Sequence, residues 1–446
     1  MRQKKLRIVF VALLICFIGF VPKSAPAGSG WKRVIVRCAP EDLDEVKRIL
    51  GAAVVDSAHG HYLLNVNSGV DTNRVSSIRG RTALVITAED DEELSLGPTN
   101  VTRTSSYAPP NSLGPISNYF GNPAPQMYSG QFAVGQIHLK DALKDATGAG
   151  VRVAVIDTGI DYSHPLFRGL IRAGRNYVGR TSIPSETDDP VIAQSAEDWI
   201  LTQSSEDWLL TQSSEDWVLT QSAEDWLLTN VGSKMLRLLA KAPSFGHGTA
   251  TAGLVHLVAP RAEIIPLKAF DARGFATEWN IVRAINDAVD MGADVINMSF
   301  AGGKTSKLIA DVIKNAAAKG VILVGASGND GEERTAYPAS YADVVGVTSV
   351  SSRDTKSTFA NYGKYVDISA PGEHLITAYP GGFASLNGTS EAAPLVAGVF
   401  ALAKDSGVRW SKLRKTVEAG VDRIEEGIYK NKLGSGRINA AKAVKD

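Results

Sequence analysis

Three short segments of the chain carry side chains that together could cleave an acyl bond. Asp157 lies in VAVIDTGID, His247 in FGHGTATAG and Ser390 in NGTSEAAPLVAG. Nucleophilic hydrolysis requires a hydroxyl, an imidazole that takes its proton and a carboxylate that orients the imidazole. Small residues flank all three side chains and allow tight backbone turns or a close approach by a substrate. The sequence therefore predicts a catalytic triad in the chain order Asp, His, Ser.

We expect the triad at one edge of a parallel sheet. Short apolar segments, typical of strands buried on both faces, recur after Gly150 and read VRVAVID, EIIPLKA, DVINMSF, VILVGAS and DVVGVTSV. Helical segments separate several of them, which predicts an α/β fold with a doubly wound, mainly parallel sheet. Asp157 ends the first strand and Asn329 follows VILVGAS, so both lie at the carboxyl edge, where such sheets bind ligands. His247 and Ser390 each begin a predicted helix.

These segments resemble the subtilisin-like serine proteases (subtilases). The resemblance covers nearly all of residues 128–446, and GASGND and YPASY occur in order between the His and Ser segments. It implies that Ser390 is the nucleophile, His247 the general base and Asp157 the residue that orients the imidazole. It also implies an oxyanion hole formed by the Asn329 side chain and the backbone N–H of Ser390.

The resemblance further implies a specificity pocket beside the nucleophile. We expect a roomy, apolar pocket with Ala336 near its base, because the residues in these positions are small. The acidic residues Asp330, Glu332 and Glu333 would favour basic substrates at its rim. The residues expected to frame the pocket are Ser299, Phe300, Ala301, Gly302, Ala326, Ser327, Gly328 and Ala336.

Two residues of the predicted Ser390 helix depart from the family pattern. Glu391 follows the nucleophile, where the family usually has Met. Its carboxylate could repel the oxyanion that develops in the reaction, stabilise the imidazolium or turn to solvent, and we expect weakened but surviving catalysis. Leu395 replaces the usual His and is expected to affect packing alone.

A calcium site found in many subtilases is expected to be absent. TAGLVHLVAP continues directly from the His247 helix without the family's Asn-rich loop, and Leu166 stands where an Asp ligand is usual. Calcium takes about six to eight oxygen ligands, and the missing loop would supply most of them. We therefore predict no metal at that position and no cofactor, although a different metal site stays possible. His164 and His256 are expected to pack in the core.

Three segments precede the predicted catalytic domain of residues 128–446. Residues 1–27 have a basic start, an apolar core and a small-residue cleavage site, typical of a secretory signal; an uncleaved anchor is the alternative. Residues 28–96 resemble the family's inhibitory propeptide, a ferredoxin-like α+β domain with strands at WKRVIVRC, HYLLNVN and TALVITAED and helices at PEDLDEVKRILG and VDTNRVSSIRG. Residues 97–127 form a Pro-rich linker, expected to be exposed and to contain the processing site.

Residues 194–229 consist of four nine-residue repeats, inserted between the Asp and His segments. They read QSAEDWILT, QSSEDWLLT, QSSEDWVLT and QSAEDWLLT, with four of the seven tryptophans and eight acidic residues. A period of nine gives neither a continuous apolar stripe on a helix nor one constant face on a strand. Two alternatives stay open, a mobile low-complexity expansion or an ordered arm that packs near the cleft or binds a partner.

Composition restricts the function further. The 47 Lys and Arg residues balance the 47 Asp and Glu residues, which gives no reason to expect a nucleic acid partner. Cys16 and Cys38 are the only cysteines, so the secreted body has no disulfide framework.

The leading interpretation is a secreted serine endopeptidase, extracellular or periplasmic, that is made as a zymogen. We expect a monomer with protein or peptide substrates, its own propeptide as intramolecular inhibitor and no stable membrane anchor after signal cleavage. A catalytically weakened subtilase-fold protein that binds a partner through the Trp-rich repeats is the main alternative. A serine esterase on the same fold differs only in its leaving group.

Overall fold

The computed structural model describes residues 31–72, 87–90, 93–95, 114–179, 181–186, 188–189, 219–220, 225–227, 242–425 and 427–445. The chain divides into two compact units, Met1–Asp90 and Asp91–Asp446. Among the described residues, no helix is both long and apolar enough to cross a membrane. The predicted signal segment lies outside the described residues.

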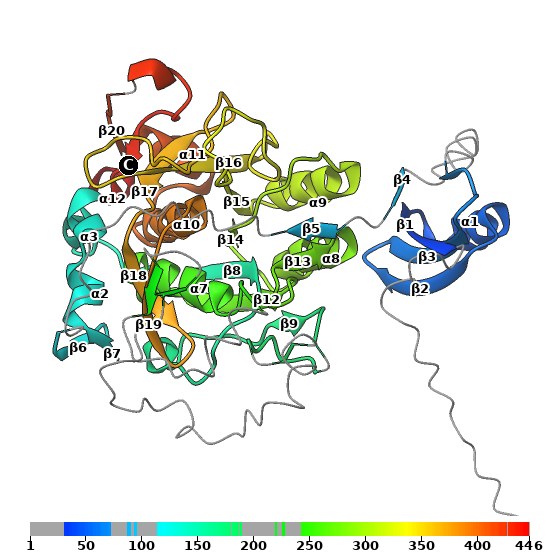
Figure 1. Cartoon of the computed structure of the whole chain (residues 1–446), viewed down its shortest axis with the longest axis horizontal. Coiled ribbons are helices and arrows are strands. Elements are labelled where there is room, and N and C mark those ends of the chain that lie inside the picture. The colour runs from blue at the N-terminus through cyan, green and yellow to red at the C-terminus, as the bar shows by residue number, and fades with distance from the viewer. Residues whose placement is uncertain are drawn as a thin grey trace, which may run out of the picture. The chain divides into compact units, whose positions relative to one another are not determined.

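The first unit contains an antiparallel sheet with the strand order β2-β3-β1-β4 (Figure 1). Its elements are β1 (Trp31–Arg37), α1 (Leu43–Leu50), β2 (Ala53–Ala58), β3 (His61–Asn67) and β4 (Thr87–Asp90), with a 3₁₀ turn at Pro40–Asp42. The helix buries Val46 and Leu50 in one cluster with side chains of β1 and β3, and it ends at Gly51 in the left-handed conformation. The sequence predicted β1, α1, β3 and β4 but missed β2, which has no fully buried residue and no alternating apolar pattern. The predicted helix VDTNRVSSIRG lies almost entirely outside the described residues.

The second unit is built on a mainly parallel sheet. Among the described residues, its nine strands have the order β20-β21-β17-β16-β15-β14-β8-β12-β9. They are β8 (Arg152–Asp157), β9 (Arg175–Asn176), β12 (Glu263–Lys268), β14 (Val295–Met298), β15 (Ile322–Ala326), β16 (Val344–Val350), β17 (Ile368–Pro371), β20 (Val421–Asp422) and β21 (Arg437–Ile438). Only β20 and β21 pair antiparallel. The predicted doubly wound α/β fold is confirmed.

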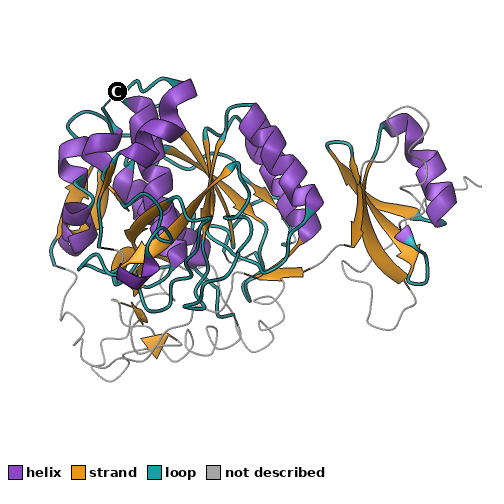
Figure 2. Ribbon diagram, turned by 90° about the horizontal axis from the view of Figure 1, so that it is seen from above, coloured by secondary structure: helices purple, strands orange, loops and turns teal. Residues whose placement is uncertain are grey.

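Helices cover both faces of this sheet, which explains why its central strands are almost entirely apolar (Figure 2). One face carries α7 (His247–Val258) and α10 (Thr389–Asp405), and the other carries α8 (Glu278–Asp290) and α9 (Lys307–Ala318). The remaining helices are α2 (Gln126–Gly130), α3 (Phe132–Gln136), α4 (Leu139–Ala142), α11 (Trp410–Ala419) and α12 (Ala440–Ala443), with 3₁₀ turns at Pro165–Phe167 and Gly427–Tyr429.

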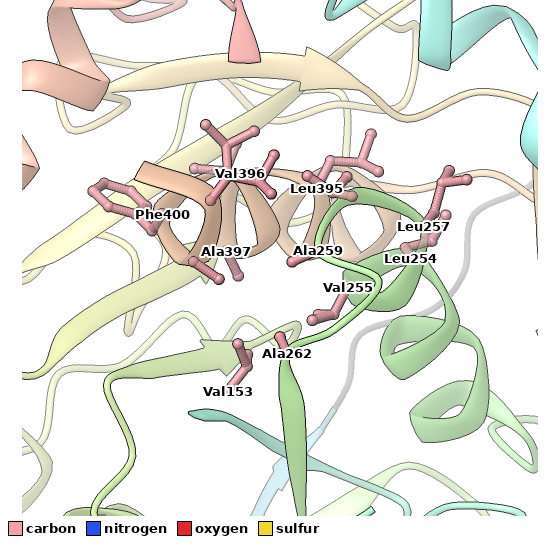
Figure 3. Packing of buried hydrophobic residues seen from close by; sticks show 14 of the residues in the cluster. Val153, Leu254, Val255, Leu257, Ala259, Ala262, Leu395, Val396, Ala397 and Phe400 are labelled. Atoms are coloured by element: carbon pink, nitrogen blue, oxygen red, sulfur yellow. The ribbon is translucent and has the colours of Figure 1, made fainter. Parts of the chain in front are cut away.

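The two helices that begin with predicted site residues pack directly against each other. Figure 3 shows their shared cluster, with Leu254, Val255 and Leu257 from α7 and Leu395, Val396, Ala397 and Phe400 from α10. A Cβ atom on Gly398 would lie only 2.6 Å from the Cβ atom of Val258, so glycine permits the close approach of the two helices. Leu395 is fully buried in this cluster. The rigid contact fixes the N-terminus of α7 relative to that of α10.

Part of the predicted linker belongs to the second unit. β6 (Ile116–Tyr119) and β7 (Asn122–Pro125) form a hairpin, Ala124 lies in the core, and the Tyr119 hydroxyl donates to the Leu257 carbonyl oxygen. The prediction of an exposed linker over all of 97–127 is therefore wrong for Asn122, Ala124 and Pro125, which are buried, whereas residues 116, 118, 120 and 121 are exposed as predicted. The Pro- and Asn-rich composition of the hairpin hides the two side chains that anchor it, and residues 97–113 lie outside the described residues.

Short strands from the repeats join a second small sheet. β10 (Leu219–Thr220) and β11 (Asp225–Leu227) continue the hairpin of β18 (Leu375–Tyr379) and β19 (Gly382–Leu386), in the order β10-β11-β19-β18. Trp226 pairs with Ser385 and Leu227 with Ala384. β19 ends four residues before Ser390, so the described residues Asp225–Leu227 pair with a strand that leads to the predicted nucleophile. The two alternatives for the repeats stay open, because most of residues 194–229 lie outside the described residues.

Candidate active site

The Asp157 carboxylate and the His247 imidazole are in direct contact. Nδ1 of His247 lies 2.8 Å from Oδ1 and 2.9 Å from Oδ2 of Asp157. The backbone N–H of Thr158 donates to Oδ1 and the Thr251 hydroxyl donates to Oδ2. These donors stabilise the charged carboxylate, which in turn keeps the imidazole proton on Nδ1 and leaves Nε2 as the basic atom.

Local backbone crowding explains the small residues around this pair. A Cβ atom on Gly248 would lie 2.1 Å from the carbonyl oxygen of Gly159, directly after the strand that carries Asp157. Glycine at position 248 therefore lets the start of α7 approach the end of β8 closely enough for the contact between Asp157 and His247.

The charges around His247 favour its protonated form. Burial alone would lower the pKa of the imidazole, but the charge and hydrogen bond of Asp157 outweigh burial, and Glu391 and Glu186 act in the same direction. Together they raise the pKa of His247 to about 9.

Ser390 is the second residue of α10 and is almost fully buried. Its hydroxyl donates to the carbonyl oxygen of Ser299 at 3.0 Å, and the Ser299 hydroxyl donates to the carbonyl oxygen of Ser390 at 2.8 Å. A reaction with His247 as base therefore requires the Ser390 side chain to rotate away from Ser299.

Asn329 follows β15 and is oriented by the residue before Ser390. Its Oδ1 atom accepts hydrogen bonds from the backbone N–H and the hydroxyl of Thr389, each at 2.9 Å. Its Nδ2 atom faces Gly388, where an added Cβ atom would lie 3.3 Å from it. Asn329 and Ser390 line the same pocket.

This pocket has a volume of about 170 Å³. Six of the eight predicted residues line it, namely Phe300, Ala301, Gly302, Ala326, Gly328 and Ala336. Ser299 and Ser327 do not, because both are fully buried and their hydroxyls bond to backbone carbonyl oxygens. The sequence missed four residues of the lining, Gly303, Arg334, Asn361 and Thr389.

Two of the three acidic residues predicted at the rim, Asp330 and Glu333, are paired with cations. Arg334 lies 3.2 Å from Asp330, and the Asn361 amide donates to the same carboxylate at 2.9 Å. Glu333 is paired with Lys432 at 2.7 Å. The spacing of four between Asp330 and Arg334 could have indicated the first pair, but nothing local indicates that Arg334 reaches the pocket.

Glu391 is 1% exposed, so the alternative that it turns to solvent is wrong. A Cβ atom on Gly388 would lie 2.3 Å from its Oε2 atom, which shows that the carboxyl uses space that the glycine leaves. Burial raises the pKa of Glu391, and attraction to a protonated His247 opposes this.

A second buried acid, Glu186, was missed by the sequence analysis. Its carboxylate accepts hydrogen bonds from the backbone N–H groups of Gly246 and Thr249 at the start of α7 and from the Thr158 hydroxyl. An anion at a helix N-terminus satisfies unpaired N–H groups and complements the helix dipole. Nearby, the buried Lys268 ammonium pairs with Asp189 at 3.0 Å and donates to the Thr158 carbonyl oxygen.

The structure does not fit the family's calcium loop. α7 ends at Val258 and β12 begins at Glu263, and Leu166 is fully buried among apolar side chains. Within the described ranges, no group of three or more His, Cys, Asp or Glu side chains is arranged to hold a metal ion.

His164 and His256 lie in an aromatic cluster. Nε2 of His164 donates to the Gly382 carbonyl oxygen, and the His256 ring stacks on Tyr128. Burial lowers the pKa of both imidazoles, that of His256 to about 3.

Comparison with known proteins adds an independent line of evidence. Residues 148–436 match the model of the Subtilase family. Thermitase of Thermoactinomyces vulgaris is 29% identical over 332 residues, which cover 72% of this chain and 98% of thermitase. The thermophilic serine proteinase of Bacillus sp. (strain AK1) is 30% identical over 342 residues, which cover 76% of this chain and 72% of that protein.

Subtilisin Savinase of Lederbergia lenta is 34% identical over 210 residues, which cover 45% of this chain and 78% of that protein. The family match spans more than half of the chain and contains Asp157, His247, Asn329 and Ser390. On this evidence, the chain belongs to the subtilase family.

Proposed function

We propose that this subtilisin-type serine endopeptidase cleaves peptide bonds through an acyl-enzyme formed on Ser390. The observation that carries the proposal is the 2.8 Å contact between His247 and Asp157, next to a pocket lined by Ser390 and Asn329. The carboxylate keeps the proton on Nδ1, so Nε2 is the atom available to act as base.

The reaction follows from these positions. After rotation from Ser299, the Ser390 hydroxyl gives its proton to Nε2 of His247 while its Oγ atom bonds to the substrate carbonyl carbon. The carbonyl electron pair becomes an oxyanion, which accepts hydrogen bonds from Nδ2 of Asn329 and the N–H of Ser390 at the start of α10. Collapse breaks the C–N bond, and the amine leaves with the proton from His247. Water then releases the acyl group by the same route.

The pocket lining supports a preference for uncharged substrate side chains. Its walls are mostly small or apolar, and the charges of Asp330 and Arg334 compensate each other. We expect peptides with Phe or Leu before the cleaved bond to have a higher kcat/KM than the matched Lys peptide. A higher kcat/KM for the Lys peptide would contradict this preference.

We also propose that the enzyme is secreted as a monomeric zymogen without a stable membrane anchor. Residues 28–96 would inhibit the cleft until cleavage in the following linker. In support, β5 (Glu93–Ser95), which already belongs to the second unit, pairs antiparallel with β13 (Phe275–Thr277), as the extended end of an inhibitory segment would. No cofactor or family calcium ion takes part in the proposed reaction.

Expression of residues 28–446 with and without Ser390→Ala tests the function. We expect the unchanged protein to cleave itself before the second unit and to hydrolyse peptides, and the Ser390→Ala protein to do neither. Cleavage of neither protein, with no peptide hydrolysis, would favour the binding-protein alternative. Hydrolysis of esters without hydrolysis of peptides would favour the esterase.

A further inference from the structure

Glu391 is a buried acid that the proposed reaction does not use. It lies in the first turn of α10, directly after the nucleophile, and among the described residues its Oε2 atom has no hydrogen-bond partner. A buried polar atom without a partner is destabilising and is uncommon in native proteins. The burial of this carboxyl without a partner for Oε2 suggests a role in the neighbouring active site.

The carboxyl lies beside the proposed oxyanion hole. The position of an added Cβ atom on Gly388 is 2.3 Å from Oε2 of Glu391 and 3.3 Å from Nδ2 of Asn329, so both atoms border the same small space. An ionised carboxylate there would repel the negative charge of the tetrahedral intermediate. A protonated carboxyl would not, and its O–H could donate a hydrogen bond instead.

The charged groups around Glu391 come from several elements. His247 on α7 and Asp157 at the end of β8 both interact with it electrostatically. Glu186, which precedes the repeats, raises the pKa of His247 through its charge. The positive charge of Lys268 in turn lowers the pKa of Glu186. On the pocket side, the Asp330 and Arg334 pair has no net charge. Behind Ser390, the neutral side chains of Asn297 at the end of β14 and of Ser299 after it are hydrogen-bonded to each other.

We propose that the Glu391 carboxyl must hold its proton for the oxyanion to form beside Asn329, so that the enzyme is active only while Glu391 is protonated and His247 is neutral. The inference rests on the proposed function, because His247 must be neutral to accept the proton of Ser390. With one proton in the pair, the form with neutral His247 and protonated Glu391 reacts. The form with an imidazolium and a carboxylate does not, since its base is already occupied.

The pH dependence follows from counting protons. At low pH both groups are protonated and His247 cannot act as base. At high pH both have lost their protons, so the base is free but a carboxylate faces the oxyanion. Activity should therefore pass through a maximum, and the two limbs belong to the coupled pair rather than to single residues. The opposing effects of burial and of each partner's charge on the two pKa values agree with such coupling.

Glu391→Gln tests the proposal, because Gln keeps the size and a donor but carries no titratable proton. We expect the alkaline limb of kcat/KM to disappear. Two pH units above its midpoint, the unchanged enzyme should lose roughly 100-fold of its maximum, while the Gln variant stays near its own maximum. Glu391→Asp is the matched control and should retain an alkaline limb. The same alkaline limb in the Gln variant as in the unchanged enzyme would overturn the proposal.

A titration of His247 by NMR in the Ser390→Ala protein gives a readout without activity. We expect two coupled steps in the His247 signals, and a single step at lower pH after Glu391→Gln. A single, unshifted step in both proteins would refute a Glu391 carboxyl that titrates beside His247, even if the enzyme cleaves peptides. Conversely, two steps in a protein whose unchanged form cleaves nothing would refute the proposed function alone. If the Gln variant does not fold, the number of steps in the His247 titration of the Ser390→Ala protein, with Glu391 intact, tests the proposal.

Discussion

At the residue scale, the triad could be predicted because each member lies in a short segment with its own local signal. Asp157 ends an apolar strand, and His247 and Ser390 follow small residues at helix starts. Arg334 and Glu186 could not be predicted in the same way. Their roles depend on contacts with pocket walls and helix ends that only the folded chain brings together.

The contact between Asp157 and His247 leads to a direct prediction. Asp157→Asn removes the charge that raises the pKa of His247 and no longer favours the proton on Nδ1. We expect kcat to fall by roughly 10⁴, with a much smaller change in KM. Steady-state kinetics on one peptide checks this, with Asp161→Asn as a control at a half-buried carboxylate that does not contact His247. Equal losses in both variants would contradict the assigned role.

At the element scale, the buried strands were predictable because a short, almost wholly apolar segment is typical of a strand whose two faces are both covered. The elements that the sequence analysis did not predict have properties in common. β2 and the β6–β7 hairpin are short, partly exposed and held by a few distant contacts, such as the hydrogen bond from Tyr119 to Leu257. The nine-residue period of the repeats matches neither a helix nor a strand, and the pairing of β11 with β19 depends on a partner strand more than 150 residues later.

The N-terminus of α7 provides an element-scale prediction. Glu186 satisfies the N–H groups of Gly246 and Thr249, and Glu186→Ala would leave both donors without this acceptor inside the protein. We expect a loss of about 1–3 kcal/mol in the free energy of unfolding, measured by guanidinium titration of the Ser390→Ala protein. Glu263→Ala removes a partly exposed partner of Arg172 and should cost clearly less. A smaller loss for Glu186→Ala than for Glu263→Ala would be inconsistent with the capping role.

At the scale of the whole molecule, stability has to come from the packed core and its buried polar contacts. The described second unit has one continuous apolar cluster that includes α7 and α10, and the chain has no cysteine pair outside residues 1–27. The connection from α7 to β12 is only four residues long. Metal removal and acid, which act on the entire fold, are therefore informative tests of its stability.

Calcium removal should leave the fold unchanged. Leu166 offers no oxygen ligand, and four residues between α7 and β12 cannot form the wrapping loop. We expect the thermal unfolding midpoint of the Ser390→Ala protein to be the same in excess chelator as in millimolar calcium. The Ser390→Ala background prevents self-cleavage from imitating a loss of stability. A midpoint that falls by several degrees in chelator would reveal a calcium site elsewhere in the chain.

Acid should destabilise the molecule through His256. Burial lowers its pKa to about 3, whereas an unfolded histidine has a pKa of about 6.5. Above pH 6.5 neither state binds the proton, so the residue has no effect on the pH dependence. Below it, the unfolded state takes up the proton first, and stability falls by about 1.4 kcal/mol per pH unit until the folded pKa is reached.

His256→Phe keeps an aromatic ring in the stack with Tyr128 and removes the titration. Between pH 7.5 and 4.5 we therefore expect the Ser390→Ala protein to lose about 2–3 kcal/mol more unfolding free energy than its His256→Phe derivative. The exposed His374, replaced by Asn, serves as the control for the loss of a histidine outside the core. Parallel pH profiles for the protein with His256 and the one with Phe would show that this histidine is not kept neutral by the core.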